Sequence, residues 1–368
     1  MKLERVEIIR VKLPLVRPFR TSFGEQTLRD VLLVNAYSTD GQGWGECAAQ
    51  VDPYYSEEFI DGAQQMLERW LIPLLLEQRN LVPEEIPELL YRVKGHRSAK
   101  AAIEMALLDM HLRVKGQSLS RYLDGVRDTV EVGVAVGIAD SISELVDVVA
   151  DYVADGYTRV KLKIEPGWDV EPVRAVRDRF GGLQIQVDAN AAYRAEDIGH
   201  LKKLDEFGLL MIEQPFEEDD LATHALFSQQ VLTAVCLDES IVSARSAEAA
   251  IDAGACSIVN IKVGRVGGLL ESRKIHDLCV LRGVDVWCGG MLESGVGRAA
   301  NVSLASMSGF TLPGDISASN RYFVQDITEP FELVGSCLKV PTGAGLGIAV
   351  DQDLLTSLGA VRTHVSSH

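Results

Sequence analysis

Residues 159–166 read "RVKLKIEP", in which aliphatic residues alternate with Lys161 and Lys163. Strict alternation gives a β-strand two chemically different faces, here one aliphatic and one that carries two lysines. On a half-exposed strand both lysines would lie in water. In a buried strand the lysine face would point into a site, and the neighbouring sequence has to separate these two possibilities.

From about residue 129 short apolar segments alternate with amphipathic helical segments, and the stretch above is the second of eight candidate strands. Eight such units predict a closed parallel barrel better than an open sheet, although open doubly wound sheets alternate in the same way. No GxGxxG fingerprint directly after a strand and no Walker A sequence occurs, so no nucleotide site is predicted. The candidate strands are "VEVGVAVGI", "RVKLKI", "LQIQVDAN", "LLMIEQP", "TAVCLDES", "SIVNIKVG", "VDVWCGG" and "GFTLPGD".

The first third of the chain has a different pattern. "LERVEIIRVKLPL", "VLLVNAYST" and "WGECA" are typical of strands, and two helical segments follow them. The second helical segment, "SAKAAIEMALLDMHLRVKG", ends on Gly116, a residue type that often terminates helices. We expect an α+β capping domain over residues 1–128 and a barrel domain over residues 129–324. The C-terminal segment, 325–368, is expected to pack back on the capping domain.

The composition limits the kinds of partner. Among 368 residues, 36 lysines and arginines stand against 53 acids, a formal charge of −17, which opposes binding to nucleic acids and anionic membranes. No run approaches the ~18 apolar residues of a membrane span, and the charged N-terminus is unlike a signal peptide. The six cysteines contain no CxxC pair and mostly lie in apolar runs. We therefore expect a cytoplasmic protein.

Five charged residues recur at the ends of successive candidate strands. Lys163, Asp188, Glu213, Asp238 and Lys262 are separated by steps of 25, 25, 25 and 24 residues. Each step is the length of one βα unit, so each residue occupies the equivalent place on its strand. In a parallel barrel that place is the C-terminal mouth, where side chains from neighbouring strands converge. The sequence thus predicts five charged groups around one small volume.

The signs of these charges indicate a chemistry. Three converging carboxylates repel one another unless a cation lies among them. Oxygen ligands without histidine or thiolate suit Mg²⁺, with Mn²⁺ or another divalent ion as the alternative. Lys163 and Lys262 fall on the second and sixth strands, hence on opposite sides of the barrel. Between them a substrate could lose the proton next to its carboxylate, with the metal stabilising the enolate.

With these motifs the sequence resembles the enolase superfamily, in particular its muconate-lactonising subgroup, over nearly the whole chain. Within the subgroup it is most similar to the N-acylamino acid racemase and o-succinylbenzoate synthase family, through "PFRTSFG", "GWGEC", "GHRSAKAAIEMAL", "QVDANAAY", "CLDESI", "NIKVGRVGG" and "CGGMLESG". The resemblance implies an α/β fold, a (β/α)7β modified TIM barrel with an α+β capping domain. It also implies lysine acid/base chemistry assisted by Mg²⁺, which is the known chemistry of this superfamily.

The resemblance assigns roles to individual residues. Lys163 and Lys262 are expected to be the acid/base pair, and the expected metal ligands are Asp188, Glu213 and Asp238. Arg265 would lower the ammonium pKa of Lys262, which favours racemisation. The residues expected around the reacting groups, with Lys161 near the substrate carboxylate, are Lys161, Asn190, Glu239 and Arg265. The residues expected to contact the substrate are Phe19, Phe23, Ala135, Gly290, Met291 and Asp315.

Several activities remain open at this stage. The first is an isomerase or lyase that acts on a small-molecule carboxylate, as an N-acylamino acid (N-succinylamino acid) racemase, an o-succinylbenzoate synthase of menaquinone synthesis, or both. The alternatives are a muconate cycloisomerase or a dipeptide epimerase of the same subgroup, and, more distantly, a non-catalytic metal-dependent acid-binding protein. A homo-oligomer is expected from the habit of the family.

Overall fold

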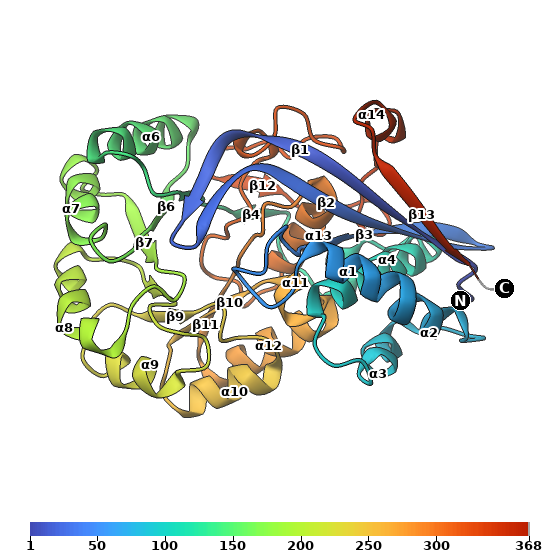
Figure 1. Cartoon of the computed structure of the whole chain (residues 1–368), viewed down its shortest axis with the longest axis horizontal. Coiled ribbons are helices and arrows are strands. Elements are labelled where there is room, and N and C mark those ends of the chain that lie inside the picture. Colours follow the sequence, from blue (N-terminus) through green and yellow to red (C-terminus); the bar gives the residue numbers. More distant parts are fainter. Residues whose placement is uncertain (367–368) are drawn as a thin grey trace.

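A computed structural model describes residues 1–366 and contains an antiparallel sheet beside a curled parallel sheet that is surrounded by helices (Figure 1). The parallel sheet has the order β11-β10-β9-β8-β7-β6-β5. Its strands are β5 (Val134–Val136), β6 (Arg159–Lys163), β7 (Gln184–Asp188), β8 (Ile212–Glu213), β9 (Val235–Leu237), β10 (Ile258–Ile261) and β11 (Asp285–Cys288). Its helices are α6 (Ile142–Asp155), α7 (Val170–Arg179), α8 (Ile198–Leu201), α9 (Leu221–Ser228), α10 (Ala244–Asp252), α11 (Val263–Val266), α12 (Leu269–Arg282) and α13 (Gly295–Ala305).

The eighth candidate strand is replaced by two isolated bridges. Phe310 pairs with Val286 of β11, and Gly314 pairs with Val132 just before β5. The Gly314 carbonyl accepts a hydrogen bond from the Gly133 amide at 2.8 Å, so this segment links both edges of the sheet. The predicted modified barrel is therefore confirmed, with irregular backbone in place of a regular eighth strand.

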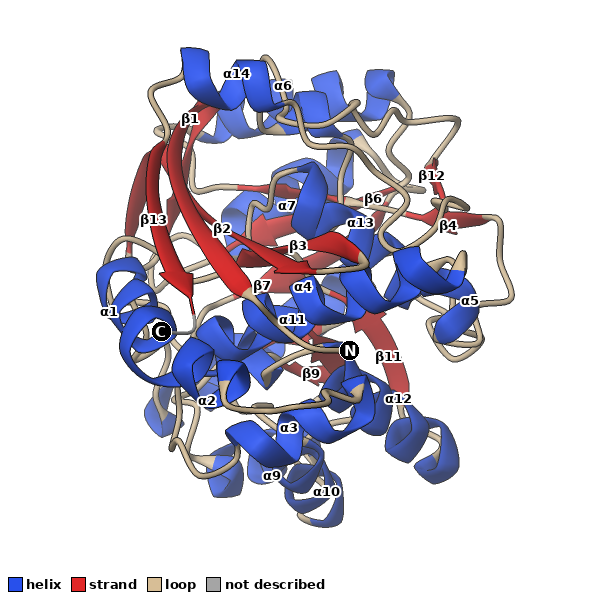
Figure 2. Cartoon of the chain, turned by 90° about the vertical axis from the view of Figure 1, so that its right-hand side faces the viewer, coloured by secondary structure: helices blue, strands red, loops and turns tan. Residues whose placement is uncertain are grey.

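Three N-terminal strands and the C-terminal strand form a four-stranded antiparallel sheet, in the order β13-β1-β2-β3, covered by helices on one side (Figure 2). This sheet and the helices that follow β3 are called the capping unit. Its strands are β1 (Arg5–Thr21), β2 (Gly24–Ser38), β3 (Gly41–Cys47) and β13 (Val361–Ser366). The helices that follow β3 are α1 (Ile60–Met66), α2 (Ile72–Leu76), α3 (Ile86–Leu90), α4 (Arg97–Lys115) and α5 (Leu119–Tyr122), with a π-helical turn at Leu67–Leu71. The remaining strands and α-helix are β4 (Thr129–Glu131), β12 (Cys337–Lys339) and α14 (Gln352–Ser357).

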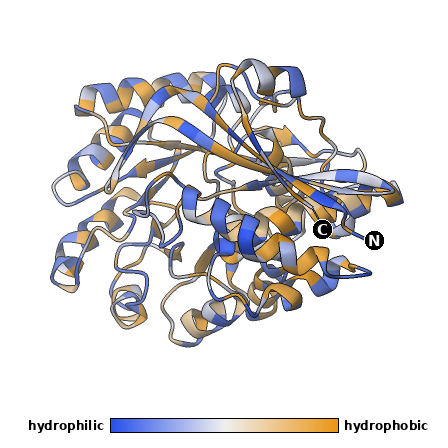
Figure 3. Ribbon diagram, turned by 45° about the vertical axis from the view of Figure 1, so that its right-hand side comes forward, coloured by the Kyte–Doolittle hydropathy of each residue, from blue (hydrophilic) through white to orange (hydrophobic). Residues whose placement is uncertain are grey.

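Helix α4 is the centre of the capping unit. Gly43 and Gly45 of β3 let its backbone approach, since a Cβ on Gly45 would lie 2.0 Å from the Ala102 carbonyl oxygen. The helix ends at Gly116, which has a φ of 64° and is a left-handed C-cap as predicted. Several outer helices carry both hydrophilic and hydrophobic residues, as expected for helices with one buried face (Figure 3).

The C-terminal strand joins the first sheet. Strand β13 pairs antiparallel with β1, from Arg5 opposite Ser366 to Arg10 opposite Val361. The domain boundaries after residues 128 and 324 stay a prediction. Within residues 1–366, no helix has the length and apolarity that a membrane crossing requires.

Candidate active site

The five charged residues at the strand ends meet at the mouth of the barrel. Lys163 stands beside Asp188 in the pairing of β6 with β7, and Asp188 stands beside Glu213 in the pairing of β7 with β8. Asp238 follows β9 and Lys262 follows β10. All five side chains are buried. The convergence predicted from the 25-residue steps is therefore present in the structure.

The two outer lysines each contact one of the acids. The Lys163 ammonium lies 2.6 Å from Asp188 Oδ2 and 2.6 Å from Asn190 Oδ1. On the other side, the Lys262 ammonium lies 2.7 Å from Asp238 Oδ2. The lysines therefore flank the acids from the second and sixth strands.

Three carboxylates at the centre could hold a divalent cation. One oxygen each from Asp188, Glu213 and Asp238 lies within 4.8 Å of the others, and all three residues have no exposed surface. Burial and the neighbouring Asp188 raise the pKa of Glu213. Hard oxygen donors at this separation fit Mg²⁺ or a similar ion. These residues fit a divalent cation.

Burial and charge set the two lysines apart. Burial lowers the pKa of Lys163, and the nearby Asp188 only partly offsets it. Burial also disfavours charge on Lys262, but Tyr55, Glu239 and Glu213 outweigh it, and the pKa of Lys262 is raised. This direction is opposite to the one expected from Arg265.

Arg265 does not set this direction, because Tyr55 and the neighbouring acids outweigh it. Its guanidinium pairs with Asp238 and donates hydrogen bonds to the backbone carbonyls of Ile241, at 2.7 Å, and Asn260. It therefore shares the carboxylate that holds Lys262. The acids that raise the Lys262 pKa include Glu213, whose charge a cation bound in the triad would offset.

A small chamber of about 50 Å³ lies above these groups. Lys163 and Lys262 both line it, so two ammonium groups from opposite sides of the barrel face one space. The tip of the β1–β2 hairpin supplies Phe19 and Phe23, two of the predicted substrate contacts. The other lining residues include Asn190, Gly290 and Met291 from the prediction, with Thr21, Gly24, Gln26, Gln50, Tyr55 and Leu292.

Two protein-family models match this chain. Residues 144–354 match the model of the enolase C-terminal domain-like family. Residues 4–124 match the N-terminal domain of mandelate racemase and muconate lactonizing enzyme. The chain belongs to the enolase superfamily.

Relatives in the superfamily extend over the full chain. An N-succinylamino acid racemase of Amycolatopsis sp is 55% identical over 368 residues, covering 100% of both proteins. An o-succinylbenzoate synthase of Geobacillus stearothermophilus is 45% identical over 354 residues, covering 96% of this chain and 94% of that protein. The crystal structure of an enolase superfamily member from Listeria innocua superposes with a TM-score of 0.95 at 40% identity, covering 100% of this chain and 99% of that one. This chain is thus an enzyme of the superfamily, of the isomerase and lyase type, in the muconate-lactonising subgroup.

Two predicted substrate residues of this enolase superfamily enzyme lie outside the chamber wall. Ala135 is buried in β5, where its carbonyl accepts a hydrogen bond from Arg321 at 2.8 Å. Asp315 is buried and forms ion pairs with Arg159 and with Lys161, whose ammonium is 2.6 Å away. Both assignments to the substrate stay predictions.

Lys161 and Gly290 have structural surroundings that the sequence did not indicate. The Lys161 ammonium also lies 3.0 Å from Asp188 and 3.0 Å from Glu213, so it contacts three carboxylates beneath the chamber. A Cβ on Gly290 would lie 2.3 Å from the Asp315 carbonyl oxygen. Gly290 is thus required for close backbone packing, in addition to any room that it leaves for substrate.

Tyr55 is the main residue that the sequence analysis missed. Its hydroxyl accepts a hydrogen bond from the Lys262 ammonium at 3.1 Å and donates one to Asp238 Oδ1 at 3.2 Å. It comes from the segment between β3 and α1 of the capping unit. No spacing relates it to the barrel strands, so no sequence pattern indicated it.

Proposed function

We propose that this enzyme abstracts the proton next to the carboxylate of a small acid and acts as a racemase of N-acylamino acids, N-succinylamino acids in particular. Syn dehydration to o-succinylbenzoate in menaquinone synthesis is a second activity of the same site. The observation that carries the proposal is the placement of Lys163 and Lys262 on opposite sides of one chamber. The 55% identity to an N-succinylamino acid racemase and the 45% identity to an o-succinylbenzoate synthase support this choice of substrates.

The two lysines divide the proton transfers. Lys163, whose pKa is lowered by burial, takes the α-proton of one enantiomer from one face. Lys262, on the other side of the chamber, gives a proton to the opposite face. The reverse sequence returns the first enantiomer. For dehydration, Lys163 serves both proton transfers and Lys262 remains a cation beside the enolate.

The three acids hold the metal in this proposal. A divalent cation on Asp188, Glu213 and Asp238, Mg²⁺ in the first instance, would neutralise the charge that develops on the substrate carboxylate. Lys161 keeps Asp188 and Glu213 oriented through contacts of 3.0 Å to each. Phe19 and Phe23 close the chamber against water from the hairpin side.

The dipeptide epimerase alternative requires an acceptor for a free ammonium group. Asp315 is the acid among the predicted substrate residues, and Arg159 and Lys161 already pair with it. An N-acylated substrate has no such ammonium. This difference favours the racemase and synthase over the epimerase.

Exchange of the α-proton in D₂O tests the proposal. The purified enzyme with MgCl₂ is incubated with N-succinyl-L-methionine, and loss of the α-proton signal and of optical activity are followed together. The initial rate of α-deuterium uptake and the initial rate of racemisation are expected to be equal. Racemisation is expected to go to completion. If no N-succinylamino acid takes up α-deuterium, the racemase proposal is wrong, and formation of o-succinylbenzoate from its hydroxy-acid precursor then tests the second activity. Cytoplasmic location and a homo-oligomeric state remain predictions.

A further inference from the structure

Two sequence motifs from distant parts of the chain meet where the capping unit touches the barrel. Glu46 of "GWGEC" lies on β3, and Ser294 of "CGGMLESG" is the N-cap of α13. The Glu46 side chain is only 3% exposed. Its carboxylate accepts hydrogen bonds from the Ser294 amide at 3.0 Å, the Ser294 hydroxyl at 2.6 Å and the Gly297 amide at 2.9 Å. An acid of the capping unit therefore holds the start of a barrel helix.

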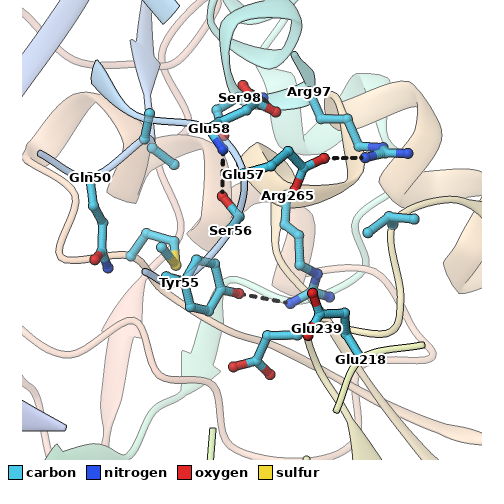
Figure 4. Close-up of a pocket in the computed structure, with 14 residues that line it drawn as sticks. Gln50, Tyr55, Ser56, Glu57, Glu58, Arg97, Ser98, Glu218, Glu239 and Arg265 are labelled. Carbon is cyan, nitrogen blue, oxygen red and sulfur yellow. Dashed lines mark hydrogen bonds and ion pairs between the residues drawn. The ribbon is translucent and has the colours of Figure 1, made fainter. Parts of the chain in front are cut away.

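The 289–294 loop, which joins β11 to α13, forms part of the wall of the reaction chamber. Gly290, Met291 and Leu292 of this loop line the chamber. Met291 also lines an adjoining cavity of about 410 Å³, together with Gln50 and Tyr55 of the capping unit (Figure 4). The position of the loop therefore sets the shape of the space beside the two lysines.

The loop has a backbone conformation that needs support from its surroundings. Leu292 has a φ of 61°, in the left-handed region that side-chain-bearing residues disfavour. A residue keeps such a conformation only where neighbouring contacts determine it. Before Leu292, the Met291 amide donates a hydrogen bond to Glu293 Oε2 at 2.7 Å. After it, the Ser294 amide donates to Glu46, so the capping unit supplies the contact on the C-terminal side.

The first turn of α13 is shaped to receive both carboxylates. A Cβ on Gly297 would lie 2.7 Å from Glu293 Cγ and 3.1 Å from Glu46 Oε2. Both acids therefore pack against bare backbone at a helix N-terminus, where negative charge is favoured. This close packing fixes Glu46 and the loop relative to each other.

We propose that Glu46 is a positioning residue for the reaction: through the first turn of α13 it holds the 289–294 loop so that Met291 stands against the bound substrate. The two lysines and the three acids of the reaction site lie at the ends of other strands. Loss of the Glu46 carboxylate therefore weakens substrate binding and leaves proton transfer and metal binding in place. This inference rests on the proposed racemase function and adds a residue of the capping unit that acts through the chamber wall.

Glu46→Gln tests the proposal. Glutamine keeps the shape of the side chain but turns an NH₂ group towards one of the donors at the start of α13. KM and kcat for α-deuterium exchange of N-succinyl-L-methionine are measured at pH 8, where Glu46 is ionised because burial raises its pKa to about 7. The variant should raise KM about 10-fold, the effect of losing a hydrogen bond to a charged group, with kcat within about 2-fold of the wild type.

Glu104→Gln is the matched control. Glu104 is also a buried acid of the capping unit, and it accepts a hydrogen bond from the Leu270 amide at the start of α12. No described residue of α12 lines the chamber. This variant should therefore leave KM and kcat within about 2-fold of the wild type. Thermal unfolding shows that each variant is folded, and calorimetry should give the same Mg²⁺ affinity for all of them.

Gly297→Ala gives an independent measurement. Its Cβ would push against both carboxylates, so this variant should also raise KM. Combined with Glu46→Gln, the two effects should not add, because both act through one contact. An unchanged KM in Glu46→Gln, or an equal rise in Glu104→Gln, overturns the inference while the racemase function stands. Absence of exchange of every N-succinylamino acid by the wild type removes the racemase function itself and the inference with it.

Discussion

Replacing Glu104 by glutamine should make the stability of the protein less dependent on pH. Glu104 lies on α4 of the capping unit, is only 2% exposed, and accepts a hydrogen bond at 2.9 Å from the Leu270 amide in the first turn of α12. It faces Gly268, where a Cβ would collide with its carboxyl group. This glutamate therefore supports the start of a barrel helix from the capping unit. Burial raises its pKa from 4.5 to about 8.

The size of the effect follows from proton linkage. Between pH 4.5 and 8 the folded protein keeps a proton on Glu104 that the unfolded chain loses. Stability from this group is thus fully present below pH 4.5 and is lost as the pH rises towards 8. Each pH unit in this window lowers the free energy of unfolding by about 1.4 kcal/mol. At pH 7 the protein is therefore less stable than at pH 4.5 by an amount on the order of 3 kcal/mol. Glutamine imitates the protonated acid at every pH.

Denaturant unfolding at several pH values measures this difference. At pH 5 the wild type and Glu104→Gln should have similar free energies of unfolding, and at pH 8 the variant should be more stable by several kcal/mol. The exposed Glu88 of α3 provides the control, since Glu88→Gln should leave the pH dependence of the wild type unchanged. A variant that is less stable than the wild type at pH 8 would show that Glu104 acts as a charged helix cap, and the reasoning from burial would be refuted.

Further outcomes are expected for three variants and for removal of the metal. Glu213→Gln should weaken Mg²⁺ binding on the order of 100-fold in calorimetry, and EDTA should abolish α-proton exchange in the wild type until Mg²⁺ is restored. Tyr55→Phe should reduce kcat about 10-fold, because the hydroxyl that contacts Lys262 and Asp238 is lost; an unchanged kcat would contradict this. Gly45→Ala should destabilise the capping unit by about 3 kcal/mol or more in thermal unfolding, since its Cβ would lie 2.0 Å from a carbonyl oxygen of α4.

The centre of the site could be predicted from the sequence because it follows the repeat of the barrel. One βα unit of about 25 residues places each strand end at the same level, so that Lys163, Asp188 and Glu213 had to meet once a closed barrel was assumed. The same regularity gave the fold class. The 25-residue step also separated Lys163 from Lys161, which contacts three carboxylates.

Features that depend on contacts between distant segments could not be predicted in this way. Tyr55 reaches Lys262 from another part of the chain, 207 residues away, without any periodic signal. The direction of the Lys262 pKa depends on which carboxylates surround it, and Arg265 turned out to share Asp238 with it. The eighth strand was expected from an apolar run, but its segment has to bridge two sheet edges and forms only isolated pairs.

The central claim is that Lys163 and Lys262 act on opposite faces of one carbon. The most direct measurement is α-deuterium exchange of the separate L and D enantiomers of an N-succinylamino acid by Lys163→Ala and Lys262→Ala. Each variant should lose racemisation, and each should retain exchange with a different enantiomer, while calorimetry shows that Mg²⁺ still binds. Racemisation by either variant, or retained exchange with the same enantiomer in both, would contradict the account.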